Sequence, residues 1–204
     1  MANRNGQPSN EEIAAQALRY IDEQGLDGFS MRKFAEYVGI PVMTISNRFG
    51  SKEALLKEAL SCMLAETSID KVSGESWSDD LRRVARMHRR MALAHPGAFP
   101  LFLSVPAYEE PMLAYTSRVF ATHEGQELPE DMPAVFLSVM HSFLSGFQLA
   151  ESFENQPSEE DRAKLADPAS PTSRVFPLFN EQSFERNLDI IIAGLAAQYH
   201  LPLQ

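Results

Sequence analysis

The chain has 204 residues, of which 44% are hydrophobic, so it can bury one large core or two smaller ones and is not intrinsically disordered. Its formal net charge of −10 excludes a protein coated uniformly with basic residues. Residues 1–60 contain seven Lys/Arg and eight Asp/Glu, a balance of −1, whereas the remainder contains eleven and twenty, a balance of −9. The chain therefore divides into a near-neutral first part and an acidic second part.

A single cysteine, Cys62, excludes a disulfide framework and a cysteine zinc site and indicates a reducing, intracellular compartment. Both a redox switch and a buried structural cysteine fit Cys62. No signal-peptide pattern opens the chain, and the longest purely apolar run, near 190–197, is shorter than the ~20 residues that span a bilayer. The sequence predicts a cytoplasmic protein with no membrane partner.

After a loose tail at residues 1–8, the first predicted helix begins with Ser9 and Glu12, which have the spacing of a capping box. Gly25 ends this helix. Its apolar face consists of Ile13, Ala14, Ala17, Leu18 and Ile21.

The stretch 30–49, SMRKFAEYVGIPVMTISNRF, predicts two short helices and a turn. Ser30 is an N-cap candidate, Gly39 suits the end of the first helix, and Pro41 suits the first position of the second. Ile45 lies four residues before Phe49, so both share one face, and the opposite face is polar. This pattern is typical of a helix-turn-helix, although two helices of an all-helical core would also fit it.

Helical patterns continue to the C-terminus, and no segment has the alternation of a strand. The fold class is therefore predicted to be all-α, with a three-helix N-terminal head and a larger helical body. The polar stretch 67–76 places the domain boundary between residues 1–65 and 66–204. The predicted body comprises helices near 78–92, 111–123, 133–154 and 183–199, a short apolar segment at 98–105, and a loop at 155–180 with at most a short helix.

Five arginines gather on the helix near 78–92, at positions 82, 83, 86, 89 and 90. Such a cluster can bind nucleic acid, but a solvated helix face that pairs with the acidic body is the favoured interpretation.

The stretch 13–60, IAAQALRYIDEQGLDGFSMRKFAEYVGIPVMTISNRFGSKEALLKEAL, resembles the N-terminal domain of the tetracycline-repressor (TetR) family of transcription regulators. The features that carry the resemblance are the first helix ending in EQG, the SMRKFAEYVGI helix and turn, Thr44-Ile45 in the second short helix, and FGSKEALL after it. Looser similarity to the tetracycline-repressor class covers HPGAFPLFLSVP, VMHSFLSGFQLAESFE and FERNLDIIIAGLAAQ. The resemblance implies a homodimeric, ligand-responsive repressor that binds an operator in double-stranded DNA.

Cations and the exposed face of the second short helix are the candidates for DNA contact. Cations can meet phosphate, asparagine can pair with adenine, and small methyl groups can meet the thymine methyl. The predicted DNA-binding residues are Ser30, Arg32, Lys33, Pro41, Val42, Met43, Thr44, Ser46, Asn47, Arg48 and Lys52. The hydroxyls of Ser30 and Thr44 could equally serve only as caps, and Lys33 or Arg48 could instead pair with Glu36 or Glu53. The family commonly has a tyrosine where this chain has Ser46.

The resemblance also implies a cavity for an unidentified small-molecule effector in the body. The predicted effector residues are His88, Met91, His95, Phe99, Phe102, Met140, His141, Ser145 and Gln148. Each could instead belong to the core. The predicted dimer interface consists of Val135, Val139, Phe143, Phe147, Leu188, Ile191, Gly194 and Leu195.

An enzyme is not expected, because no G-x-S-x-G, phosphate-loop or H-E-x-x-H pattern occurs, and neither a metal nor a cofactor is expected. A protein-interaction module, or an activator without small-molecule induction, is the alternative to a ligand-responsive repressor. Repression is the family's usual mode, but whether the protein represses or activates depends on where the operator lies relative to the promoter.

Overall fold

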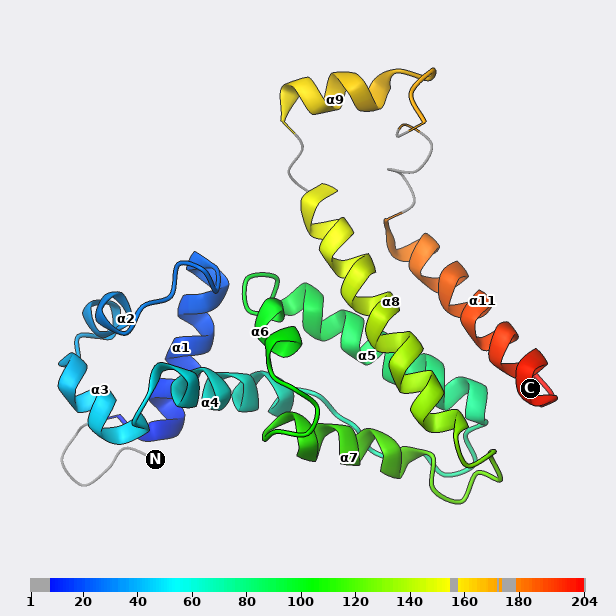
Figure 1. Ribbon diagram of the computed structural model, residues 1–204, viewed down its shortest axis with the longest axis horizontal. Coiled ribbons are helices and arrows are strands. Elements are labelled where there is room, and N and C mark those ends of the chain that lie inside the picture. The colour runs from blue at the N-terminus through cyan, green and yellow to red at the C-terminus, as the bar shows by residue number, and fades with distance from the viewer. Residues whose placement is uncertain (1–7, 155–157, 172, 174–178, 204) are drawn as a thin grey trace. The chain divides into compact units, whose positions relative to one another are not determined.

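The computed structural model describes residues 8–154, 158–171, 173 and 179–203. Within these residues every regular element is a helix, which confirms the all-α prediction (Figure 1). Residues 1–7 of the predicted tail lie outside the described part, as do residues 155–157, 172 and 174–178 of the predicted loop.

The chain divides into two compact units. One unit comprises Met1–Asp70 and Arg90–Val119, and the other comprises Lys71–Arg89 and Phe120–Gln204. Helices α5 (Trp77–Ala94) and α7 (Met112–Thr122) each contribute residues to both units. The boundary predicted between residues 65 and 66 stays a prediction.

The first unit opens with four helices: α1 (Asn10–Gln24), α2 (Met31–Val38), α3 (Val42–Phe49) and α4 (Lys52–Ala65). Ser9 and Glu12 form the predicted capping box, which satisfies two otherwise unpaired amides at the start of α1. The predicted apolar face of α1 is buried, and α1 packs along α4 (Figure 1). α6 (Phe99–Ser104) and most of α7 complete this unit.

The second unit contains most of α5 together with α8 (Met132–Glu154), α9 (Glu159–Ala166) and α11 (Glu181–Tyr199). α9 is the short helix that the sequence allowed in the loop. α5, α8 and α11 share one hydrophobic core, in which Phe136, Phe184 and Leu188 are at most 1% exposed. α11 starts two residues before the predicted Ser183, because the Asn180 side chain accepts a hydrogen bond from the Ser183 amide at 3.0 Å.

α8 is apolar almost all round, as predicted, but it is not buried on every side. Val135 is 37% exposed, Val139 39% and Leu149 54%. By length and composition, Met132–Glu151 could cross a membrane, with a mean hydropathy of 1.3 and 28% of it buried. Core helices of soluble proteins pass the same test, so this finding is weak support for a membrane span.

Candidate nucleic-acid interface

The turn between α2 and α3 is fixed by its backbone conformation. The Ser30 hydroxyl accepts a hydrogen bond from the Lys33 amide at 3.3 Å, so the predicted N-cap is confirmed. Gly39 has a φ of 67°, a left-handed conformation that glycine adopts without a Cβ penalty. The prediction for Pro41 is wrong by one position, because α3 starts at Val42 and Pro41 is its N-cap residue, with a ψ of 134°. Helical residues must have a negative ψ, so Pro41 stays outside α3.

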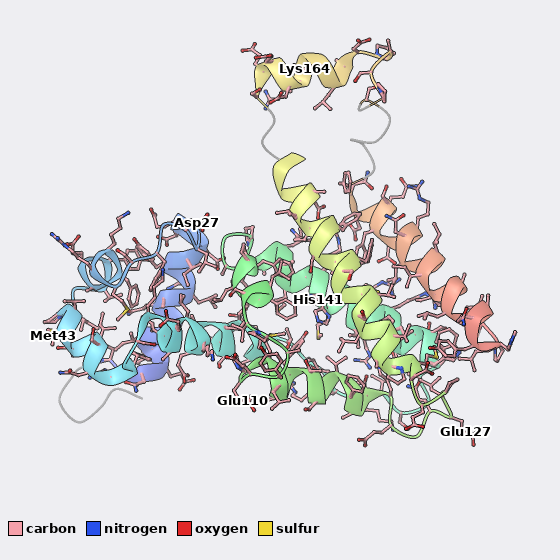
Figure 2. The ribbon with its side chains drawn as sticks, viewed as in Figure 1. Asp27, Met43, Glu110, Glu127, His141 and Lys164 are labelled. Atoms are coloured by element: carbon pink, nitrogen blue, oxygen red, sulfur yellow. The ribbon has the colours of Figure 1, made fainter. Side chains whose placement is uncertain are left out.

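α3 presents one face to the core and another to solvent. Ile45 is 0% exposed and is the buried residue of this helix. Met43 is 65% exposed, Val42 is 38% exposed, and Asn47 is also exposed. Figure 2 shows Met43 on the outer side of α3. Val42, Met43 and Asn47, which were predicted to contact DNA, are therefore accessible on α3, and Thr44 is half-buried beside them.

An aromatic cluster that the sequence pattern did not predict holds α2 on α1. The Tyr20 ring centroid lies 5.8 Å from that of Phe29, 5.8 Å from that of Phe34 and 4.9 Å from that of Tyr37. All three pairs meet edge to face, the geometry favoured by the ring quadrupoles. The signal was present in the sequence, since Tyr20 lies seven residues after Ile13 on the apolar face of α1.

Two of the four cations predicted to bind DNA, Arg48 and Lys52, also hold the head together, whereas Arg32 pairs within its own helix. Arg32 Nε lies 3.1 Å from Glu36 Oε1, so Arg32 forms the ion pair with Glu36 that was considered for Lys33. Arg48 Nη1 donates to the Pro8 carbonyl at 2.5 Å. Lys52 Nζ donates to the Phe29 carbonyl at 3.0 Å and lies 5.6 Å from the Phe29 ring centroid. The DNA contacts of all four cations, and those of Ser46, stay predictions.

The predicted effector residues are divided between the two units. Met91, His95, Phe99 and Phe102 belong to the first unit, and the other five belong to the second. Phe99 and Phe102 stack with ring centroids 5.6 Å apart. The nine residues are therefore not all members of one compact unit.

The histidines differ sharply in environment. His88 is buried, and its Nδ1 lies 2.9 Å from the Val84 carbonyl, so Nδ1 must carry the proton. Burial lowers the pKa of His88 to about 4, so the ring is neutral at physiological pH. Asp22 and Glu66 lie within hydrogen-bond distance of the two ring nitrogens of His95, and its effector contact stays a prediction.

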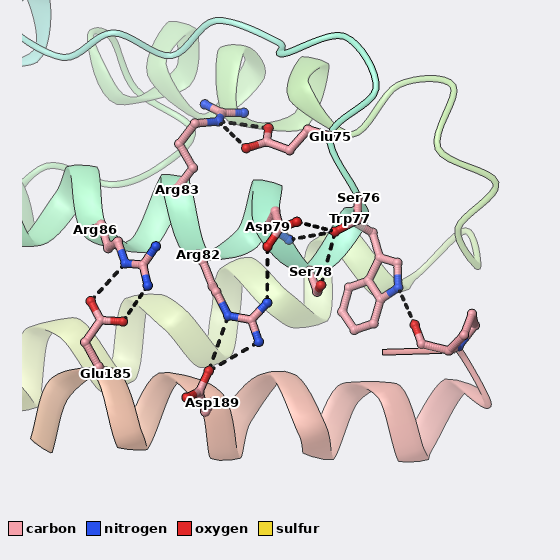
Figure 3. Close-up of polar contacts among 11 residues, drawn as sticks. Glu75, Ser76, Trp77, Ser78, Asp79, Arg82, Arg83, Arg86, Glu185 and Asp189 are labelled. Carbon is pink, nitrogen blue, oxygen red and sulfur yellow. Dashed lines mark hydrogen bonds and ion pairs between the residues drawn. The ribbon is translucent and has the colours of Figure 1, made fainter. Parts of the chain in front are cut away.

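Four of the five arginines of α5 pair with acids, as favoured from the sequence, and the fifth, Arg90, is exposed. Figure 3 shows Arg82 bound to Asp189 and Arg86 to Glu185, both acids on α11, and Arg83 bound to Glu75. Arg86 and Glu185 make a bidentate pair at 2.9 and 2.7 Å. These pairs neutralise Arg82, Arg83 and Arg86 within the second unit.

Arg89 differs from its neighbours because it is buried. It donates two hydrogen bonds of 2.8 Å to Glu151 on α8, and each side chain is 9% exposed. Its guanidinium carbon lies 5.3 Å from the Phe147 ring centroid and 4.8 Å from the Phe184 ring centroid. Water therefore has little access to replace either partner of the pair.

The predicted dimer interface needs correction at three positions. Phe147, Leu188 and Leu195 lie in the hydrophobic core of one chain, with 5%, 0% and 6% exposure, so they have almost no surface left for a partner. Val135, Val139 and Gly194 are exposed, and Phe143 and Ile191 are half-buried. The error arises because α11 buries the face of Leu188, Ile192 and Leu195 within its own unit.

Comparison with known proteins gives the family of the chain. The model for bacterial regulatory proteins of the tetR family matches residues 13–59, and the model for the tetracyclin repressor-like C-terminal domain matches residues 72–199. The chain belongs to the TetR family. As a TetR-family protein, it is a DNA-binding transcription regulator.

Individual relatives agree over nearly the whole chain. The class D tetracycline repressor protein of Escherichia coli is 29% identical over 96% of this chain and 93% of its own length. The TetR-family protein ActR of Streptomyces coelicolor, solved in complex with actinorhodin, has a TM-score of 0.75 at 22% identity and covers 95% of this chain and 99% of its own. A TetR variant from Acinetobacter baumannii AYE, solved in complex with minocycline, has a TM-score of 0.66 at 20% identity. The match covers 95% of this chain and 99% of the variant's own chain.

The buried pair of this TetR-family body gives a stability prediction. We expect Glu151→Gln to destabilise the fold by about 3–5 kcal/mol, because it removes the carboxylate that is bound to the buried Arg89 charge. Arg86→Gln breaks the more exposed pair between Arg86 of α5 and Glu185 of α11. This substitution should lower the stability of the fold by less than about 1 kcal/mol. Urea unfolding at one protein concentration measures both. Equal losses in the two variants would contradict the role of burial.

Proposed function

We propose that the protein is a ligand-responsive repressor of the bacterial cytoplasm that binds a near-palindromic operator as a homodimer. The observation that carries the proposal is the accessible face of α3, held in place by a buried Ile45. A helix of this kind enters the major groove, where base edges carry a distinct pattern for each base pair.

Asn47 is the proposed base-reading residue with the most specific chemistry, because its amide can pair with adenine through two hydrogen bonds. Val42, Met43 and Thr44 supply apolar contacts beside it. Lys33 is the proposed phosphate contact that is best suited to a direct test, since its side chain is exposed and can be truncated without disturbing the core. Arg48 and Lys52 would serve both the head and the DNA.

Two exposed stripes support a dimer. On α8, Val135, Val139 and Leu149 recur on one face, with 37%, 39% and 54% exposure. On α11, Ile190 is 63% exposed, and Gly194 lies four residues further along the same face. A second copy could pack its α8 and α11 on these stripes to form a four-helix bundle, and the dimer then carries two α3 helices, one for each half-site.

The proposed effector contacts combine apolar and polar groups of the second unit. Met140 and Gln148 on α8 are 3% and 8% exposed, and His88 on α5 is 6% exposed. Small-molecule sites are mostly apolar with a few placed polar groups, which fits this set. The ligands of the two solved relatives support a small organic effector. Its binding would shift the population toward a form that binds the operator poorly.

Head substitutions test DNA binding. We expect Asn47→Ala to relax sequence preference by about 1–3 kcal/mol at one base pair of each half-site. Lys33→Ala should weaken binding to all sequences and reduce the salt slope by about 0.9 for each phosphate that the lysine neutralises. Fluorescence anisotropy on specific and scrambled duplexes measures both effects, with Lys164→Ala, an exposed lysine of α9, as the control. An unchanged salt slope in Lys33→Ala would remove Lys33 from the interface.

Charge placed on the exposed stripe tests the dimer. We expect Val139→Asp to yield a monomer at micromolar concentration, because an unpaired carboxylate would be buried between the copies. Leu113→Asp is the matched control, since Leu113 is 46% exposed on α7 in the other unit. Light scattering gives the mass of each variant. A wild-type monomer at that concentration would overturn the homodimer proposal.

Induction is tested by thermodynamic reciprocity. An effector that weakens operator binding by about 5–150-fold must itself bind that much more weakly when the operator is present. Calorimetry with minocycline and with actinorhodin, with and without a bound operator duplex, measures the ratio. Gln148→Leu should lower effector affinity without changing operator affinity. Equal effector affinities in the two states would show that the bound compound does not regulate DNA binding.

A further inference from the structure

His95 lies between two carboxylates that come from different helices of the first unit. Its Nδ1 lies 2.6 Å from Asp22 Oδ2 in the last turn of α1, and its Nε2 lies 2.9 Å from Glu66 Oε2 at the C-cap of α4. The His95 side chain is 13% exposed, compared with 21% for Asp22 and 58% for Glu66. A carboxylate only accepts hydrogen bonds, so both interactions are satisfied only when both ring nitrogens carry protons.

The turn that follows His95 is bound to the same aspartate. The Ala98 amide donates to Asp22 Oδ1 at 3.0 Å, so one carboxylate holds both His95 and the start of α6. Gly97 shows how close this approach is, because a Cβ there would lie 2.5 Å from the Asp22 carbonyl oxygen and 2.7 Å from the Ile21 carbonyl oxygen. Any larger residue would push the turn away from α1. We name His95, Asp22, Glu66 and the Ala98 amide the His95 clasp.

The clasp lies on the chain path between the DNA-binding head and the rest of the molecule. α1 and α4 pack together and form the base on which α2 and α3 sit. His95 follows directly after α5, the helix that contributes residues to both units. A conformational change in the end of α5 or in α6 would therefore reach α1 and α4 through the His95 clasp.

We propose that His95 is a positioning residue for operator binding, and that its doubly protonated ring holds the turn at residues 95–98 against α1 and α4. Loss of one ring proton directs a nitrogen lone pair at a carboxylate, which opens one side of the clasp. Operator affinity then falls as the pH rises. This inference rests on the proposed function, because it concerns how the head is set for DNA.

The charges around His95 favour its doubly protonated form. Burial of the ring opposes its charged form, but the hydrogen bonds and charges of Asp22 and Glu66 outweigh burial, so the pKa of His95 is raised above 6.5. The end of α5, from Met91 to Ala94, and α6 carry no titratable side chain. A raised pKa means that the stabilisation is fully present below pH 6.5 and is lost as the pH rises through the higher pKa of the folded state.

Ring titration tests the clasp in the intact protein without relying on DNA. We expect the NMR resonances of His95, assigned with His95→Gln, to titrate above pH 6.5 in the wild type. Glu66→Gln should lower that pKa, and Glu58→Gln, an exposed acid on the same helix, should leave it unchanged. Glu66 is largely exposed, so its variant keeps the core intact. A wild-type pKa at or below 6.5, or equal effects of the two glutamine variants, would overturn the clasp.

Operator binding tests the positioning role. At constant ionic strength, the wild type should lose at least about fivefold more affinity than His95→Gln between pH 6.0 and pH 8.5, the lower end of typical coupling between sites. The thermal midpoint of the wild type should exceed that of His95→Gln most at pH 6.0 and least at pH 8.5. Identical pH profiles of DNA binding would overturn the positioning role. A wild type that binds no operator at any pH would instead refute the proposed function, while the ring titration would still decide whether the clasp exists.

Discussion

The placement of α3 depends on the burial of Ile45. α3 has eight residues, and Ile45 is the one that is fully buried among them. Burying such a side chain contributes about 1.5–3 kcal/mol, which exceeds what a helix of two turns gains from its own hydrogen bonds in water. The left-handed Gly39 sets the direction in which α3 leaves α2. The exposed face of Val42, Met43 and Asn47 is the geometric consequence of these two constraints.

Contacts with α1, α2 and α4 limit the movement of α3 in two ways. Aromatic contacts of Tyr20 tie α2 to α1, and α1 in turn packs along α4. Polar contacts from Arg48 and Lys52 then tie α3 and the start of α4 to backbone carbonyls. A cation that is already bound to the head loses less side-chain entropy when it meets a phosphate, so these contacts preorganise the surface for DNA.

The sequence by itself determined the helices, the caps at Ser9 and Ser30, and the location of the head. Capping at Ser9 and Ser30, the glycine after α2, and the apolar period of α1 all act within a few residues, so they can be read along the chain. The accessible face of α3 also followed from its period. The family resemblance supplied what periodicity could not, namely the class of function.

Only the tertiary structure decided which partner each polar or apolar group meets. Leu188 and Val139 are both apolar residues of helices in the same unit, yet Leu188 is 0% exposed and Val139 is 39% exposed, because the packing of α5, α8 and α11 covers one face and leaves another. The contact of His95 with Asp22, which lies 73 residues away in sequence, was not visible in the sequence pattern. Sequence spacing encodes the faces of a single helix, whereas contacts between distant segments arise only when the helices pack.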